Sequence, residues 1–411
     1  MTIMKKTIAG LLLATAMTAP AFAQDAVTIN YMTFSAAPDY IEELEATIAA
    51  FEAEHPNINI EYETAAFGDY FTKLQTVVAA GTAPDAFELN YENFVTYAEK
   101  GALADLTPLL AADAGFDPAI YNPTALAAFT HDGKQYGLVE SFSNVVLFYN
   151  KDLFDAAGVA YPSADWTWDD DLAAAQKLTA DGVWGYFAPI PFWEFYKTIA
   201  QNGGSILSDD KSTVTIDSAQ NVETLTWMVD KINTYKVTPS DIDMAGQSDG
   251  DLFKAGKIAM LRTGIWMFGD FTANAKFNWD IALEPGKTQK AHHFFANGVA
   301  ISANSTHSAE AYEWIKFLTS SKAAVEIRIN AGWELPAVTD ASYVQGYLDQ
   351  PAPASREIVF DALDSAVVPP VIGNWNHLTD VVGKELEAAK LGTKTPEQAL
   401  ADAKVAIEAI L

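Results

Sequence analysis

Aromatic side chains stand where the sequence predicts loops or the first turns of helices. They are Phe192, Trp193, Trp266, Trp333 and Trp375. A planar apolar ring can stack on the C–H face of a sugar ring, while neighbouring Asn, Asp and Glu side chains bind the hydroxyl groups. The chemistry that these residues suggest is carbohydrate binding. The alternative for each ring taken singly is packing in a hydrophobic core.

Sequence signatures of catalysis and of metal binding are absent. The chain has no H-E-x-x-H, no G-x-S-x-G and no glycine-rich phosphate loop. His292 and His293 are adjacent, and neighbours along a strand point to opposite faces, so they cannot easily share one ion. We therefore expect no catalytic residue, metal or cofactor. A glycosidase pair could still be hidden among the 54 acidic residues, so a secreted carbohydrate-active enzyme is the alternative of another class.

Three strand-and-helix pairs follow the first residues of the chain and could position such a site. Their order is typical of a parallel, doubly wound sheet, in which ligands bind beyond the carboxyl ends of the strands. The strands are expected at 27–34, 58–62 and 86–89, and the helices at 38–54, from 69 onward and at 92–99. The loops at the strand ends, which we expect to converge on one edge, hold Phe34, Ser35, Phe67, Gly68, Asp69, Tyr70, Asn90 and Tyr91.

Two long strand-like segments, 138–150 and 291–302, predict that the chain crosses twice between two domains. A single core of nearly 390 residues is unusual, which also favours two domains. We expect an N-terminal lobe, a C-terminal lobe and a hinge near Glu140 to Phe142. The N-terminal lobe is assigned residues 24–139 and 294–345, and the C-terminal lobe residues 140–293 and 346–411.

The first 23 residues predict a secretory signal peptide. Lys5 and Lys6 precede an apolar stretch that is too short to span a bilayer, and Ala21-Phe22-Ala23 forms a cleavage site of small residues. The chain has no cysteine, so neither a disulfide nor a lipid attached through cysteine can form. An exported protein without a lipid anchor is retained by an outer membrane, which points to a Gram-negative periplasm.

The formal net charge of −29 argues against nucleic acid and anionic membranes as partners. An excess of Asp and Glu is typical of an abundant soluble protein.

Several segments together resemble the family 1 extracellular solute-binding proteins of ABC importers, a group that includes maltose-binding protein. The strongest is residues 67–85, FGDYFTKLQTVVAAGTAPD. Further matches, in the same order along the chain, are YAEKGALADL at 97–106, LFYNKDLF at 147–154, QNGG at 201–204, FKAGKIAM at 253–260 and GIW at 264–266.

This resemblance implies a periplasmic binding protein-like α/β fold, with ligand held in a cleft between two hinged lobes. It also implies a monomer that captures a mono- or oligosaccharide and delivers it to the permease subunits of an ABC transporter. The positions to which the resemblance assigns ligand contact are Asp69, Tyr70, Asn90, Tyr91, Glu140, Phe192, Trp193, Trp266, Gly298 and Trp375. Glu140 and Ser141 match the first crossing between the lobes in the family.

Arg262 departs from the family pattern, in which a neutral residue usually precedes the Trp266 position by four. An arginine fork fits phosphate, sulfonate or carboxylate, so an anionic sugar or polyol derivative is the alternative ligand. A salt bridge with one of the many carboxylates is the alternative role for Arg262.

Overall fold

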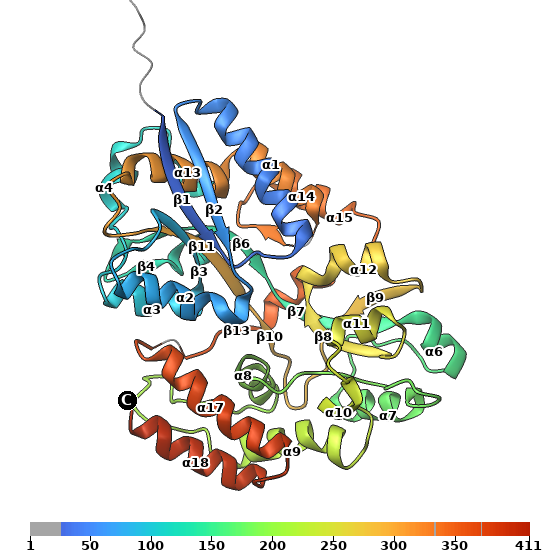
Figure 1. Ribbon diagram of the computed structural model, residues 1–411. Helices are drawn as coiled ribbons and strands as arrows, with labels where there is room; N and C mark the ends of the chain where they lie inside the picture. Colours follow the sequence, from blue (N-terminus) through green and yellow to red (C-terminus); the bar gives the residue numbers. More distant parts are fainter. Residues whose placement is uncertain (1–25, 333, 371) are drawn as a thin grey trace, which may run out of the picture.

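The computed structural model describes residues 26–332, 334–370 and 372–411 (Figure 1). The predicted signal peptide and the predicted ligand-binding residue Trp333 lie outside these residues. The described chain forms two α/β lobes, each built on its own sheet. The expected two-lobed α/β fold is thus confirmed.

A six-stranded mixed sheet forms the centre of the first lobe. Strand β1 is parallel to β2 and β3, as the sequence predicts, whereas β11 returns from far along the chain and lies antiparallel to β3 and β6. Side chains of β2 alternate between buried and exposed, and those of β3 are all buried because helices cover both faces there. The strand order is β12 (Leu335–Pro336), β6 (Gly137–Ser143), β11 (Phe295–Ile301), β3 (Ala86–Asn90), β1 (Val27–Thr33) and β2 (Ile58–Thr64).

Helices pack on both faces of this sheet. On one face, Trp314 of α13 (Ser308–Ser320) contacts Tyr31 of β1 and Phe51 of α1 (Pro38–Glu54), with ring centroids 5.6 and 5.2 Å apart. The next helix, α14 (Lys322–Ala331), packs against α1. The other face carries α2 (Phe67–Ala79) and α3 (Tyr91–Glu99). Both begin where a strand of the sheet has just ended, so their first turns face the second lobe (Figure 1).

The second lobe has a small antiparallel sheet in the order β8 (Met260–Gly264), β7 (Val145–Asn150) and β9 (Trp279–Ala282). Its largest apolar core joins helices from distant parts of the chain. These helices are α8 (Phe192–Gln201), α9 (Ala219–Asn233), α17 (Trp375–Lys390) and α18 (Pro396–Glu408). Also in this lobe are α6 (Lys151–Ala157), α7 (Trp168–Leu178), α10 (Asp241–Met244), α11 (Asp249–Lys254), η2 (Ile265–Met267) and α12 (Phe268–Asn274).

The chain passes between the two sheets at Asn144, where β6 ends and β7 begins. The predicted strand 138–150 is therefore two strands in different sheets. The Asn144 side chain donates to the carbonyl of Val359 (2.8 Å) and is fully buried. Residues 140–143, which were assigned to the C-terminal lobe, belong to β6 of the first-lobe sheet. We propose Asn144 as the first crossing point.

The predicted strand 291–302 is also divided. β10 (His292–His293) pairs with β13 (Ala366–Val367), and β11 pairs within the first-lobe sheet. Phe294 lies between them. The chain crosses again between α15 (Ala341–Leu348), which packs on α14, and β13.

Short elements complete the described chain. They are α4 (Thr107–Ala112), η1 (Pro118–Ile120), α5 (Pro123–Ala127), β4 (Thr130–His131), β5 (Lys134–Gln135), α16 (Ile358–Asp361) and η3 (Ala362–Ser365).

Candidate ligand-binding cleft

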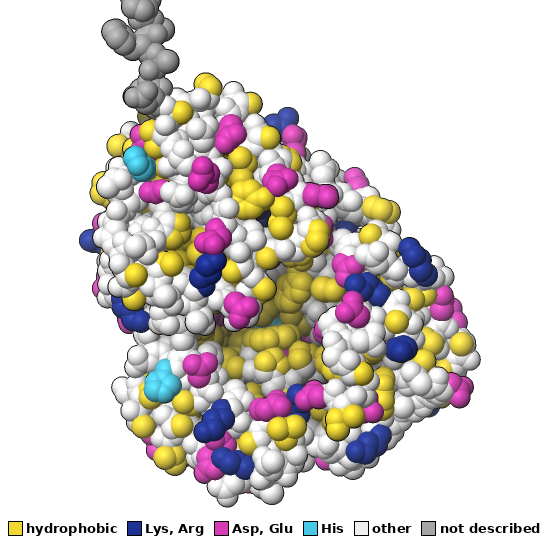
Figure 2. All heavy atoms as spheres, viewed as in Figure 1, with side chains coloured by type: hydrophobic (Ala, Val, Ile, Leu, Met, Phe, Trp, Pro, Cys, Tyr) yellow, Lys and Arg dark blue, Asp and Glu magenta, His cyan; other side chains and the backbone are white. Residues whose placement is uncertain are grey.

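A cavity of about 920 Å³ lies between the two lobes. In Figure 2 it is a hollow with an apolar lining, between the upper and lower halves of the molecule. Its walls come from the ends of β1 and β3 and the starts of α2 and α3 in the first lobe. From the second lobe they come from residues 187–191, α8, η2 and α17. The volume lies near the upper end of the range of roughly 300–1,000 Å³ that is usual for small-molecule sites.

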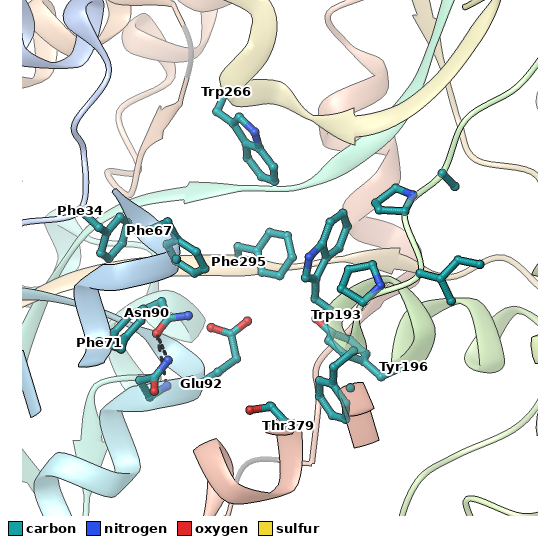
Figure 3. Close-up of a pocket in the computed structure, with 18 of the residues that line it drawn as sticks. Phe34, Phe67, Phe71, Asn90, Glu92, Trp193, Tyr196, Trp266, Phe295 and Thr379 are labelled. Carbon is teal, nitrogen blue, oxygen red and sulfur yellow. Dashed lines mark hydrogen bonds between the residues drawn. The ribbon is translucent and has the colours of Figure 1, made fainter. Parts of the chain in front are cut away.

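Aromatic rings line this cavity from both lobes (Figure 3). Phe34 packs edge-on against Phe67, with ring centroids 5.3 Å apart, and Phe67 is 54 % exposed. The ring centroid of Trp266 in η2 lies 6.0 Å from that of Phe295 in β11. The cavity therefore offers several apolar ring faces that a ligand could cover.

Two hydrogen bonds hold the tryptophan platforms in place. The Tyr40 hydroxyl donates to the carbonyl of Trp266 (2.8 Å), which ties α1 of the first lobe to η2 of the second. His293 Nε2 donates to the carbonyl of Trp193 (2.7 Å), and the His293 ring stacks on Phe295 with centroids 4.8 Å apart. Burial lowers the pKa of His293 to about 3, so its imidazole is neutral. The buried side chain of His293 thus contacts both Trp193 and Phe295.

Polar groups cluster where α3 faces α8. The Asn90 side chain caps α3 by accepting from the backbone N–H of Asn93 (3.3 Å). Three lining atoms here are buried and have no hydrogen-bond partner among the described residues: Glu92 Oε2, Asn93 Oδ1 and Tyr196 Oη. Such atoms cost free energy. An opening of the cleft to water, or a ligand with hydroxyl groups, would relieve that cost.

Two carboxyl groups in the cleft have raised pKa values. Burial raises the pKa of Glu92 to about 7. The pKa of Glu334 also rises to about 7, because burial outweighs the opposing effect of the Arg328 guanidinium nearby. Glu334 accepts a hydrogen bond from Ser141 and one from Asn297 (3.2 Å). Near neutral pH each carboxyl group can therefore gain or lose a proton. It can donate a hydrogen bond when protonated and only accept when ionised.

The charges that line the described cavity are mostly acidic. Among the described lining residues the one basic side chain is Lys390, which pairs with Asp241 (2.8 Å) and Glu387 (3.3 Å). Five lining residues are acidic: Glu92, Asp241, Glu334, Asp380 and Glu387. An anionic ligand would therefore meet like charges without a free cation.

Seven of the predicted ligand-binding residues line the cavity. They are Phe34, Ser35, Asn90, Phe192, Trp193, Trp266 and Trp375. They converge because parallel strands end at one edge of the first sheet, and because α8, η2 and α17 begin opposite that edge.

Arg262 does not reach the cavity, and the prediction that it contacts ligand is wrong. Its side chain is fully buried in the second lobe, where Nη1 lies 3.2 Å from Glu284 and 3.4 Å from Glu194, and Nη2 lies 3.8 Å from Asp171. The alternative role that the sequence allowed, a salt bridge, is the one observed. The argument for an anionic ligand loses the residue on which it depended.

Five further predicted residues lie outside the lining of the described cavity. Asp69 is exposed on α2 and Tyr91 is half-buried on α3. Tyr70 is fully buried, and its hydroxyl donates to the carbonyls of Glu88 (2.8 Å) and Met32 (3.0 Å). Glu140 is buried and accepts a hydrogen bond from Arg328.

The space left by the missing side chain of Gly298 is occupied by another side chain of the protein and not by ligand. A Cβ there would lie 2.7 Å from the buried ring of Phe129. The absent side chain is needed for packing in the first-lobe core.

The sequence reasoning missed several lining residues. Glu92 was one of many carboxylates with no distinguishing motif, although it stands two residues after Asn90. Phe295 lies inside a predicted strand. Phe67 was expected in a loop at the ligand edge and does line the cavity, although it was not among the predicted ligand-binding residues. The missed lining residues from both lobes include Tyr40, Phe71, Glu92, Asn93, Tyr196, Phe295, Asn297 and Glu334.

The described residues contain neither a membrane-spanning helix nor a metal-binding cluster. No helix there combines the length and apolar content that a membrane span requires. Nor does that part of the chain bring three His, Asp or Glu side chains together as a metal site would need.

Comparison with known proteins identifies the family. Residues 37–325 match the family model described as bacterial extracellular solute-binding protein. The solved structure of an ABC substrate-binding protein from Listeria monocytogenes, in complex with cycloalternan, is 49% identical. It covers 94% of this chain and 99% of its own, with a TM-score of 0.91.

Two relatives known from sequence extend the comparison. A putative binding protein of Brucella abortus is 27% identical over 423 residues, which cover 100% of this chain and 99% of the relative. The sn-glycerol-3-phosphate-binding periplasmic protein of Escherichia coli is 24% identical, and the match covers 87% of each chain. The chain belongs to the bacterial extracellular solute-binding proteins.

Proposed function

We propose that this protein captures a neutral oligosaccharide in the cleft between its lobes. The observation that carries the proposal is the arrangement of the cleft, in which exposed aromatic faces from both lobes surround a group of unpartnered polar atoms. Sugars present apolar C–H faces and many hydroxyl groups, which match these two kinds of surface. The complex of the Listeria relative with cycloalternan supports the same ligand class.

A neutral ligand is favoured over an anionic one by the charges of the described lining. Lys390 is already paired, and the other charged lining residues are acidic. Arg262, which could have bound a phosphate, is neutralised within the second lobe. The relative that is named for sn-glycerol-3-phosphate therefore serves less well as a guide to this ligand.

In this proposal, Trp193, Trp266 and Phe34 stack on sugar rings, and Asn90 and Glu92 bind hydroxyl groups. Closure of the lobes would bury the ligand and give the shape that the permease subunits of an ABC importer recognise. The protein would act as a monomer in the periplasm, as a carrier and not as an enzyme.

A thermal-shift screen followed by calorimetry tests the proposal. The probes are neutral oligosaccharides, including maltose and cycloalternan, and matched anionic ligands, including glycerol 3-phosphate and a uronic acid. A ligand that binds only the folded form raises the melting temperature. We expect neutral sugars alone to do so, and mass spectrometry to recover them intact. Binding of the anions only, or cleavage of the sugar, would refute the proposal.

A further inference from the structure

The cavity does not end at the aromatic rings between the lobes. It continues along the second lobe in what we call the outer arm, whose walls include Pro189, Ile190, Pro239, Gly383, Glu387 and Lys390. The first three face α17 from the loops before α8 and α10. The arm is continuous with the interlobe site, because both belong to one cavity.

The cavity follows one face of α17 along its whole length. The α17 residues that line it are Trp375, Asn376, Thr379, Asp380, Gly383, Glu387 and Lys390, the first and last being the ends of the helix. At a rise of 1.5 Å per residue this face is about 22 Å long. A sugar unit built from bonds of about 1.5 Å advances a chain by roughly 5 Å. The face has room for about four units.

Gly383 leaves a gap in the wall of the arm. It lies in the interior of α17, and a Cβ placed there would meet no atom within 4 Å. Glycine inside a helix is destabilising relative to alanine. At Gly298 a side chain is excluded because the core is packed against the backbone there. At Gly383 no neighbouring atom excludes a side chain. The feature that Gly383 provides is therefore open space in the arm.

The rest of the arm suits an uncharged, hydroxyl-bearing occupant. Proline and isoleucine give an apolar wall on one side, and the exposed carboxylates of Asp380 and Glu387 lie on the α17 side. At the far end Lys390 is neutralised by Asp241 and Glu387. Carboxylates accept hydrogen bonds from sugar hydroxyl groups.

We propose that the outer arm is an extension subsite that holds the outer units of an oligosaccharide of about four sugars. The inner units lie between the aromatic rings, so this inference rests on the proposed function. Ligands of two units would fill the interlobe site alone. Ligands of four units would also contact the arm and bind more tightly.

Gly383→Leu tests this proposal, because it adds a side chain to the open space and favours the helix. Lys384→Leu is the matched control, one position along α17, exposed and outside the lining. The probes are gluco-, arabino- and chito-oligosaccharides of two and four units, and cycloalternan, titrated by calorimetry. In the series that binds, we expect Gly383→Leu to weaken the four-unit ligand at least tenfold and the two-unit ligand less than twofold. The control should change neither.

A second variant, Asp380→Ala, removes one hydroxyl acceptor without filling space. We expect it to weaken the four-unit ligand roughly threefold to tenfold. An equal loss for both lengths in Gly383→Leu, or no loss for either, would overturn the subsite while leaving the proposed function intact. A wild-type protein that binds none of the saccharides would overturn the proposed function and this inference with it.

Discussion

Two regions of this protein combine aromatic rings with carboxylates. In one region these groups face a cavity, and in the other they are buried among cationic side chains. In the cleft, the rings of Trp193 and Trp266 face a cavity and the nearby Glu92 has an unpartnered oxygen. In the second-lobe core, which we call the charged core, Trp168 and Trp227 stack 4.0 Å apart and Lys231 lies 3.3 Å from the Trp227 ring centroid. The charged core also contains Asp171, Glu194, Lys197, Arg262 and Glu284.

The difference between the two regions is the source of the neutralising partner. The charged core contains its own cations, Lys197, Lys231 and Arg262, which lie within 4.0 Å of its carboxylates. Some of its carboxylate oxygens, including both of Asp171, accept no hydrogen bond among the described residues, but their charge is balanced from within the protein. The cleft has the same residue types without a free cation among its described lining residues, so its ring faces and polar atoms are left for a partner from outside. Changes in the charged core should alter stability, and changes in the cleft should alter ligand affinity.

The largest expected effect is in the charged core. Arg262→Met leaves buried carboxylates without their cation and should lower the free energy of unfolding by about 3–5 kcal/mol. Urea denaturation measures the loss. The control is Lys322→Met, which removes the exposed pair Lys322–Glu326 and should change the free energy of unfolding little. A severe loss of sugar affinity in folded Arg262→Met, at unchanged stability, would contradict the comparison.

The next effect links the cleft to pH. The pKa of Glu92 rises to about 7 on folding, so its charged form destabilises the protein, and this cost grows as pH rises from about 4.5 through 7. Glu92→Gln should therefore be more stable than wild type at pH 8, on the order of 3 kcal/mol, and close to wild type at pH 4. Urea denaturation at both values measures it. A constant difference across this range would show that Glu92 does not titrate there.

The same variant should also weaken sugar binding, because the substitution replaces a carboxylate acceptor with an amide. Higher stability together with lower affinity would mark Glu92 as a binding residue kept at a cost to the fold. Calorimetry at pH 8 gives the affinity, and unchanged affinity would remove Glu92 from the proposed site.

Trp193→Ala should weaken sugar binding by about 2 kcal/mol, since central aromatic anchors carry much of a binding free energy. Trp166→Ala is the matched control, because Trp166 packs against a second-lobe core and does not line the described cavity. Calorimetry with the sugar that binds wild type measures both. Equal losses in the two variants would indicate a general effect on the lobe and not a stacking platform.

The smallest expected effect concerns the contact between the lobes. Tyr40→Phe removes the hydrogen bond from α1 to the carbonyl of Trp266 and should weaken binding by about 1 kcal/mol. Small-angle scattering should show a larger radius of gyration for the ligand-free variant than for wild type. An unchanged radius and affinity would show that this bond does not hold the cleft closed.

The sequence predicted the aromatic platforms better than the polar groups. Trp193 and Trp266 were recognisable because large rings in early helical turns and loops are unusual, and both line the cavity. Glu92 was not recognisable among many carboxylates. Tyr70 was misplaced by one helical position, since the next residue, Phe71, lines the cavity. Glu140 lies in the first-lobe interior, where it pairs with Arg328.

Local patterns in the chain were sufficient for the first three strand-and-helix pairs, since these depend on residues within a few positions of one another. The family followed from several short segments in a fixed order along the chain. Tertiary structure alone decided which charges have partners. Arg262 meets Asp171, Glu194 and Glu284, which are far from it in sequence, and Glu92 meets none at its Oε2 among the described residues. Burial and pairing are properties of the packed chain, so the role of a charged residue, and with it the choice of a neutral ligand, follows only from the fold.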